Sequence, residues 1–181
     1  MINVALGFRQ KIGHWLNERR ESVTVQGFKG KLSSVSTMLI CADVDTDEQR
    51  DALNLLKSQM KNLCPSAKLT IVCCHQKSSG EDNFISGDGT LYVSEDDLSF
   101  WFKFRNKSLA EILASEYDMA IILPEQNDII LNFIADYVHS GLRVGRDNCG
   151  TADYLNFKIA DNSNIKSFIP KLLKNLQMVF S

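Results

Sequence analysis

The feature of this 181-residue chain that most constrains its fold is an alternation of short apolar runs with longer amphipathic stretches. Three of the runs centre on Met38-Leu39-Ile40, Ile71-Val72-Cys73 and Ala120-Ile121-Ile122. Runs this uniformly apolar are typical of strands that are buried on both faces of a parallel sheet. Helical stretches between such strands indicate βαβ units with right-handed crossovers. We therefore predict an α/β fold with a doubly wound, mostly parallel sheet of five or six strands, Rossmann-like or flavodoxin-like.

The bounds of the expected elements follow from periodicity, capping residues and prolines. Four strands, at 36–43, 68–74, 118–123 and 142–145, should be mutually parallel in one sheet. Shorter strands are expected at 90–93 and 154–159. The first expected helix runs from Asp45 or Thr46 to before Pro65, and the second has Ser108 as its N-cap, Glu111 completing a capping box, and Glu116 as its end. A third helix is expected from Asp128 to His139. The last runs from Ile165 to Val179, with a kink or restart at Pro170.

The first 34 residues differ from the rest, and we expect them to form a basic amphipathic helix and a linker ahead of an α/β domain at 35–181. Residues 1–31 hold six Lys and Arg against two Glu, a net charge of +4, whereas the whole chain carries −2. Residues 2–20 place an apolar stripe at helical spacing. The stripe consists of Val4, Phe8, Ile12, Trp15 and Leu16. Such a helix needs a surface to cover its stripe: its own domain, a second copy in a homodimer, a separate protein partner or a membrane.

Composition excludes several classes of function. A net charge of −2 gives no general attraction for nucleic acid, so no nucleic-acid partner is expected. The five cysteines form no C-x-x-C pair, which is typical of buried thiols in a reducing compartment. No signal peptide and no apolar run of membrane-spanning length is visible, so we expect a cytoplasmic protein.

Ligands of open α/β sheets bind beyond the carboxyl ends of the strands, which directs attention to the residues that follow each strand. The candidate ligand-binding residues are Asp43, Asp45, Lys103, Glu125, Asn127 and Arg146. The loop after the first strand has no glycine motif, and its three carboxylates repel a phosphate, so neither dinucleotide nor nucleotide is expected there. The spacing Asp43-x-Asp45-x-Asp47 leaves a divalent cation or phosphoryl chemistry open, but it favours an acidic, solvated loop that caps a helix. We expect no bound metal and no cofactor.

Two further patterns bear on ligand binding and nucleophilic catalysis. Trp101, Lys103 and Arg105 alternate with phenylalanines, as in a half-buried amphipathic strand, and the same edge suits stacking on a sugar or a nucleic acid. The histidines lie in different elements, no G-x-S-x-G occurs, and Cys74 and His75 should point to opposite faces of a strand. We name no catalytic residue.

Several segments carry a resemblance to known families. They are Asp97-Leu98-Ser99-Phe100-Trp101 with Lys103, Glu116-Tyr117-Asp118-Met119-Ala120-Ile121-Ile122, and Leu142-Arg143-Val144-Gly145-Arg146. From about Leu32 onward the chain resembles a family of small uncharacterised proteins from Bacteroidetes, which implies a fold and no activity. Tyr117-Asp118, the strand and helix after it, and Leu142-Arg143-Val144-Gly145 are also similar to the N-terminal Rossmann-like domain of heptosyltransferase-type glycosyltransferases.

These observations favour a non-enzymatic or accessory cytoplasmic α/β protein that acts through association, as a homodimer or with a protein partner held by the N-terminal helix. Two alternatives stay open. One is a glycosyltransferase-related single domain that binds a sugar or nucleotide sugar, as the resemblance implies. The other is a peripheral membrane protein attached through residues 1–20.

Overall fold

The structure is a computed structural model that describes residues 28, 30–75, 89–99, 103–124, 129–147 and 155–181. The expected N-terminal helix lies outside these residues. The described elements, in chain order, are η1 (Leu32–Ser34), β1 (Thr37–Asp43), α2 (Asp47–Leu63), β2 (Lys68–His75), β3 (Thr90–Ser94), η2 (Glu95–Asp97), α3 (Lys107–Leu113), β4 (Glu116–Leu123), α4 (Ile129–Tyr137), β5 (His139–Arg146), β6 (Phe157–Ile159) and α5 (Ile165–Phe180).

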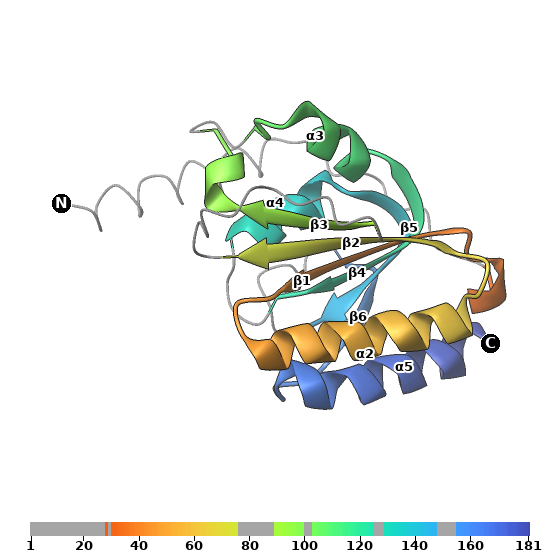
Figure 1. Ribbon diagram of the computed structural model, residues 1–181. Helices are drawn as coiled ribbons and strands as arrows, with labels where there is room; N and C mark the ends of the chain where they lie inside the picture. Colours follow the sequence, from red (N-terminus) through yellow and green to blue (C-terminus); the bar gives the residue numbers. More distant parts are fainter. Residues whose placement is uncertain (1–27, 29, 76–88, 100–102, 125–128, 148–154) are drawn as a thin grey trace.

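The sheet has six strands in the order β3-β2-β1-β4-β5-β6, and every neighbouring pair is parallel (Figure 1). Ile40 in the central strand β1 pairs with Ile71 of β2 on one side and with Ile121 of β4 on the other. These are the apolar centres of the runs seen in the sequence, so the predicted parallel sheet is confirmed. The strand order reverses direction between β1 and β4, which marks the topological switch point.

Helices cover both faces of the sheet, as a doubly wound fold requires. Met38, Ile40 and Ala42 of β1 lie in the same core cluster as buried residues of α2 and α5. Leu39 and Cys41, between them in sequence, lie in the opposite cluster with residues of α3 and α4. Figure 1 shows α2 and α5 lying together along one face. Alternate residues of each strand thus serve two separate cores.

Four features of the helices differ from the sequence prediction. α3 ends at Leu113, and Glu116, which was predicted to end this helix, begins β4. Asn106, and not Ser108, caps α3, because its side-chain oxygen accepts a hydrogen bond from Leu109 N–H at 3.3 Å. α4 ends at Tyr137, and His139 begins β5 by pairing with Glu116 of β4. Here pairing between strands outweighs the helical periodicity that runs through His139. α5 continues through Pro170 without a restart.

Hydrogen bonds accepted by one side chain align the amino ends of the two central strands. Asp118 of β4 accepts bonds through Oδ2 from the backbone N–H groups of Ser36 and Thr37, at 2.7 and 2.9 Å. The Thr37 hydroxyl in turn accepts a bond from Asp118 N–H at 3.1 Å. The Tyr117-Asp118 segment is therefore a structural tie at the amino edge of the sheet, opposite the edge where ligands bind in such folds.

Candidate functional site

The carboxyl edge of the sheet is the place where this fold can hold a ligand, because the strand ends and the first turns of two helices meet there. α2 begins after β1 and α5 begins after β6. Their first turns are joined by a hydrogen bond of 3.2 Å from Asn164 Nδ2 to Glu48 Oε1. The positive ends of both helix dipoles therefore face the same region of the molecule.

The three carboxylates after β1 point in different directions. Asp43 is buried, and it lies on the strand face of Leu39 and Cys41, toward α3 and α4. Asp45 lies on the other side, with its Oδ1 3.9 Å from His75 Nδ1. Asp47 is exposed in the first turn of α2, where it pairs with Arg50 at 2.9 Å. In the part of the chain that the structure describes, no cluster of His, Cys, Asp or Glu suits a metal ion.

The sequence interpretation of this loop as a helix cap holds for its second half. Thr46 is the N-cap of α2, and its hydroxyl accepts a bond from Gln49 N–H while the Gln49 side chain accepts one from Thr46 N–H. The first half differs, because Asp43 is buried and the loop is not fully solvated. Two acidic side chains, Asp47 and Glu48, occupy the first turn of α2. That turn therefore repels anions.

Among the described residues, His75 and the four buried cysteines offer no activated nucleophile. Burial lowers the pKa of His75 below its ordinary value of 6.5, and this effect outweighs the opposing pull of Asp45, so the imidazole is neutral at pH 7. Its ring stacks on Tyr92, with ring centroids 5.4 Å apart. Cys74 lies in the opposite core cluster, as expected from strand alternation. Burial raises the pKa of Cys41 far above its usual range and raises that of Cys64 as well, so both thiols stay protonated.

This edge also carries a buried cation, Arg146. It is the last residue of β5, only 6% of its surface is exposed, and its guanidinium carbon lies 4.6 Å from the ring centroid of Phe168 in the first turns of α5. Its Nη2 atom is buried and has no hydrogen-bond partner, and no ion pair joins Arg146 to a carboxylate among the described residues. A buried guanidinium that stacks on an aromatic ring and pairs with no described carboxylate is an unusual element of a folded core.

A hollow of about 440 Å³ lies at the carboxyl ends of β5 and β6. Its lining residues are Asp147, Ala160, Asp161, Asn162, Ser163 and Lys171. Arg146 is not among them, although it precedes Asp147 in sequence and pairs in register with Ile159, two residues before Asp161. Its ring partner Phe168 is one turn of α5 from Lys171. Arg146 and the hollow therefore share the same end of the sheet.

The carboxylate of Asp161 is the best-connected group in the hollow. It accepts a hydrogen bond from Ser163 N–H at 2.6 Å and a second one from the Ser163 hydroxyl. It also forms an ion pair with Lys171, whose side chain is half exposed. The Lys171 ammonium, followed by the two Ser163 donors, holds the pKa of Asp161 well below its usual range. Asp161 is thus charged and internally neutralised by Lys171 at any physiological pH.

The structure describes four of the six sequence candidates, and it does not bring these four into one cluster. Arg146 lies on the sheet face toward Phe168 and α5, whereas Asp43 lies on the face toward α3 and α4. Lys103 is exposed in the connection from β3 to α3, where its N–H donates to Ser99 Oγ at 3.0 Å. Glu125 and Asn127 lie outside the described residues, as does Trp101. The sequence analysis missed Asp161 and Lys171, for which the one available signal was an Asp-x-Ser-Asn run directly before a helix.

The comparisons with known proteins give a family and no activity. A family model described as a family of unknown function (DUF6913) matches residues 8–179. No curated protein and no solved structure matches the chain. Among the described residues, no helix is long and apolar enough to cross a membrane. Because the match covers nearly the whole chain, the protein belongs to the family of unknown function DUF6913.

Proposed function

We propose that this protein binds a small anionic ligand at the carboxyl edge of its sheet, with Arg146 as the cation that anchors the carboxylate or phosphate group. The observation that carries this proposal is the burial of the Arg146 guanidinium with an Nη2 atom that meets no acceptor among the described residues. Burying a cation without a counter-charge costs free energy, which an anion bound at this point would recover. Arg also suits carboxylate and phosphate because its planar fork can donate two parallel hydrogen bonds.

The charges of the two helix starts support the α5 side of the edge. The first turn of α5 has no acidic side chain, and Lys166 and Lys171 follow its N-cap. The first turn of α2 carries Asp47 and Glu48 instead. A helix N-terminus attracts anions only where its own side chains leave the dipole uncompensated. The start of α5 is therefore more favourable to an anion than the acidic loop after β1, with Asp147 and Asp161 as the carboxylates that the anion must avoid.

The size and lining of the hollow support a metabolite-sized ligand. Ligand pockets commonly span about 300–1,000 Å³, and the hollow at the same end of the sheet as Arg146 has about 440 Å³. Asn162 and Ser163 add neutral hydrogen-bonding groups that suit ligand hydroxyls. A hydroxylated anion such as a sugar phosphate fits both features, which keeps a sugar-binding single domain related to glycosyltransferases as the second reading. We propose binding without catalysis, since the buried thiols and the neutral His75 give no activated nucleophile.

Thermal unfolding with added anions tests the proposal. Inorganic phosphate, acetate and a hexose 1-phosphate are added to the intact chain, with sodium chloride at matched ionic strength as the reference. At a hundred times its dissociation constant a ligand stabilises by about 2.7 kcal/mol. We expect stabilisation by at least one anion beyond the chloride reference, and the ranking separates carboxylate from phosphate chemistry.

Matched variants assign the effect to the site. Arg146→Gln should lose the anion-dependent stabilisation, whereas Lys103→Gln, which removes an exposed cation elsewhere, should keep it. Equal stabilisation of both variants would show a general salt effect and overturn the assignment to Arg146. The absence of any anion effect in the intact chain would overturn the proposal itself.

A further inference from the structure

The outer edge of β3 is open to pairing in the part of the chain that the structure describes. β3 is the first strand in the order β3-β2-β1-β4-β5-β6, so β2 is its one neighbour there (Figure 1). The strand, Thr90–Ser94, contains no charged residue, no proline and no glycine. Natural sheets usually protect an edge with such residues, with a bulge or with a covering segment, because an open edge pairs with another strand. The sequence of β3 supplies none of the protecting residues.

The register of β3 determines which of its backbone groups face outward. Ile71 N–H donates to Gly89 C=O at 3.1 Å, and Ile71 is in register with Thr90. In a parallel pair this directs the backbone groups of every second residue toward β2. The residues whose backbone groups face outward are Thr90, Tyr92 and Ser94.

Tyr92, at the centre of β3, provides the best groups for pairing. Its N–H and C=O have no hydrogen-bond partner among the described residues. Ser94 N–H, by contrast, donates to Asp97 Oδ2 at 2.8 Å, which ends the edge on that side. The Tyr92 ring is 39% exposed and is held in place by stacking on His75. A side chain that is already ordered loses little entropy when a partner covers it.

The sequence of β3 is complementary to itself when two copies run antiparallel about Tyr92. Tyr92 then faces Tyr92 of the second copy, Leu91 faces Val93, and Thr90 faces Ser94. Each opposed pair joins side chains of one kind, aromatic, apolar or hydroxyl, and no like charges meet. In the hydrogen-bonded type of antiparallel pair, two opposed residues exchange both N–H···O=C bonds. The two outward groups of Tyr92 match that exchange.

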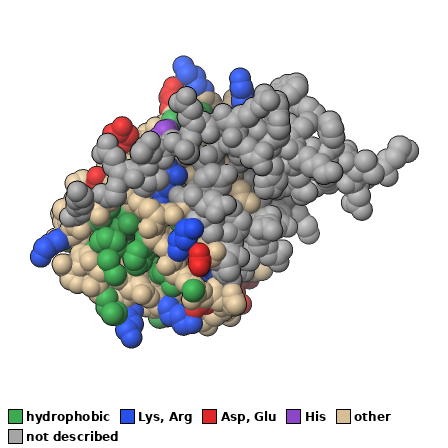
Figure 2. Space-filling view, turned by 180° about the vertical axis from the view of Figure 1, so that it is seen from behind, with side chains coloured by type: hydrophobic (Ala, Val, Ile, Leu, Met, Phe, Trp, Pro, Cys, Tyr) green, Lys and Arg blue, Asp and Glu red, His purple; other side chains and the backbone are tan. Residues whose placement is uncertain are grey.

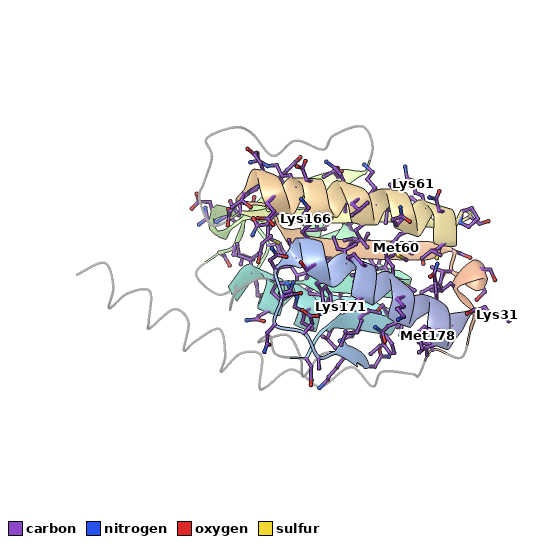
Figure 3. The ribbon with its side chains drawn as sticks, turned by 90° about the horizontal axis from the view of Figure 1, so that it is seen from below. Lys31, Met60, Lys61, Lys166, Lys171 and Met178 are labelled. Carbon is purple, nitrogen blue, oxygen red and sulfur yellow. The ribbon has the colours of Figure 1, made fainter. Side chains whose placement is uncertain are left out.

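Other exposed surfaces of the described residues suit a symmetric contact less well. At the opposite edge of the sheet, β6 has Lys158 at its centre, so two antiparallel copies would oppose like charges. Figure 2 shows Lys and Arg beside the hydrophobic side chains on the rear of the molecule. In the last turn of α5, Met178 is 72% exposed, but Figure 3 places Lys31 at the same end of the molecule, and two such basic ends repel each other. That turn also holds a ring cluster of Phe28, Phe157 and Phe180.

We propose that two copies of this chain associate through β3, which pairs antiparallel with β3 of the second copy about Tyr92. The pairing joins the two six-stranded sheets into one continuous sheet. Leu91 and Val93 of both copies then extend the core cluster on the face of α3 and α4. Because the paired strands run in opposite directions, the carboxyl edges of the two sheets point away from each other. Each copy therefore keeps its own ligand edge.

Disulfide crosslinking of the intact chain tests the pairing and its register. Opposed residues of a hydrogen-bonded antiparallel pair have Cα atoms about 5.5 Å apart, a distance that a disulfide spans. Tyr92→Cys should therefore form a covalent dimer on mild oxidation. Ser94→Cys should not, because its thiol would face Thr90 of the second copy. Leu55→Cys, at an exposed position of α2, is the control for random collision, and the parent chain, whose described cysteines are buried, gives the baseline.

Sedimentation equilibrium without oxidation gives a second measurement. The parent chain should show a monomer–dimer equilibrium that depends on concentration. Tyr92→Lys should raise the dimer dissociation constant roughly tenfold or more, because it opposes two cations at the centre of the pair. Leu55→Lys and Met178→Lys, at exposed positions away from β3, should leave that constant unchanged.

Three results would overturn the proposal. The first is a chain that stays monomeric at every concentration. The second is crosslinking of Ser94→Cys or Leu55→Cys as rapid as that of Tyr92→Cys. The third is a dimer that Met178→Lys dissociates and Tyr92→Lys does not, which would assign the contact to the last turn of α5.

Discussion

Arg146 carries a charge for which the described part of the fold supplies an aromatic ring and no carboxylate. In the proposed site the buried charge lowers the free energy of unfolding and provides anion binding, and a substitution can separate these two effects. Arg146→Met keeps the length and apolar contact with Phe168 and removes the buried charge. We expect its free energy of unfolding without ligand to be unchanged or higher by roughly 1 kcal/mol, because replacing buried charge with apolar volume is often neutral or stabilising.

Urea unfolding of Arg146→Met with and without phosphate checks this expectation. The variant should show no phosphate-dependent stabilisation. A loss of more than about 2 kcal/mol without ligand would mean that the guanidinium serves packing on Phe168, and it would weaken the case for an anion site.

Close approach of a neighbouring backbone leaves no room for a side chain at Gly145, next to Arg146. A Cβ atom built there lies 2.6 Å from the carbonyl oxygen of Ile122 and 2.8 Å from Leu155 Cδ1. Gly145→Ala should therefore lower the free energy of unfolding by about 1–3 kcal/mol, since β4 and β5 must separate to admit the methyl group.

Gly141→Ala is a control on the same strand for this prediction. Its Cβ would meet Asp118 O at 3.4 Å and Phe28 Cδ2 at 3.9 Å, which are ordinary contact distances. Chemical denaturation of the two variants should show a clear difference, with Gly141→Ala within about 0.5 kcal/mol of the parent chain. Equal losses at both positions would show that strand glycine in general, and not the contact with Ile122, sets the cost.

At the scale of elements, the start of α5 should give the protein a pH-dependent stability. The pKa of Asp161 is held far below its ordinary value of 3.8 by Lys171 and Ser163, so the unfolded chain binds this proton more readily than the folded one. Its contribution is therefore fully present above about pH 5 and is lost as the pH falls below 3.8 toward the folded-state pKa. Asp161→Asn should melt below the parent chain at pH 7, and the two melting temperatures should converge toward pH 2.

Thermal melts across this pH range, with Asp51→Asn as a comparison in the exposed part of α2, isolate the effect. A difference in melting temperature that stays constant from pH 7 to pH 2 would contradict a charge-based role for Asp161 and leave only its contacts as a hydrogen-bond acceptor.

The sequence predicted the central elements well and their ends poorly, for one physical reason. β1 and β4 contain uninterrupted apolar runs, at residues 38–42 and 119–123, because both faces of the sheet are buried there, and that signal does not depend on which strand is the partner. Caps depend on close competition between neighbours. Asn106 and Ser108 both suit an N-cap, and in the structure Asn106 takes that position. Pro170 is tolerated because Phe168, Ile169 and Leu172 bury their side of the helix, which propensity alone does not reveal.

The candidate site divides in the same way. Arg146 was predictable because it ends a strand, and ligands gather at strand ends in this fold. The ion pair between Asp161 and Lys171 joins residues ten positions apart through the packing of α5 against β6, so no local sequence pattern predicts it. The burial of Asp43 depends on which face of β1 it occupies, and strand register settles that only when the sheet assembles.

At the scale of the whole molecule, α5 connects two ends of the fold. Its first turns place Phe168 against Arg146, and its last turn places Phe180 against Phe28. Sixteen residues of helix span about 24 Å, which is the separation of these two contacts along the helix. Phe168, Leu172 and Leu176 are all fully buried. Because the core anchors it along its length, α5 is a rigid spacer between the carboxyl edge of the sheet and the ring cluster at its own last turn.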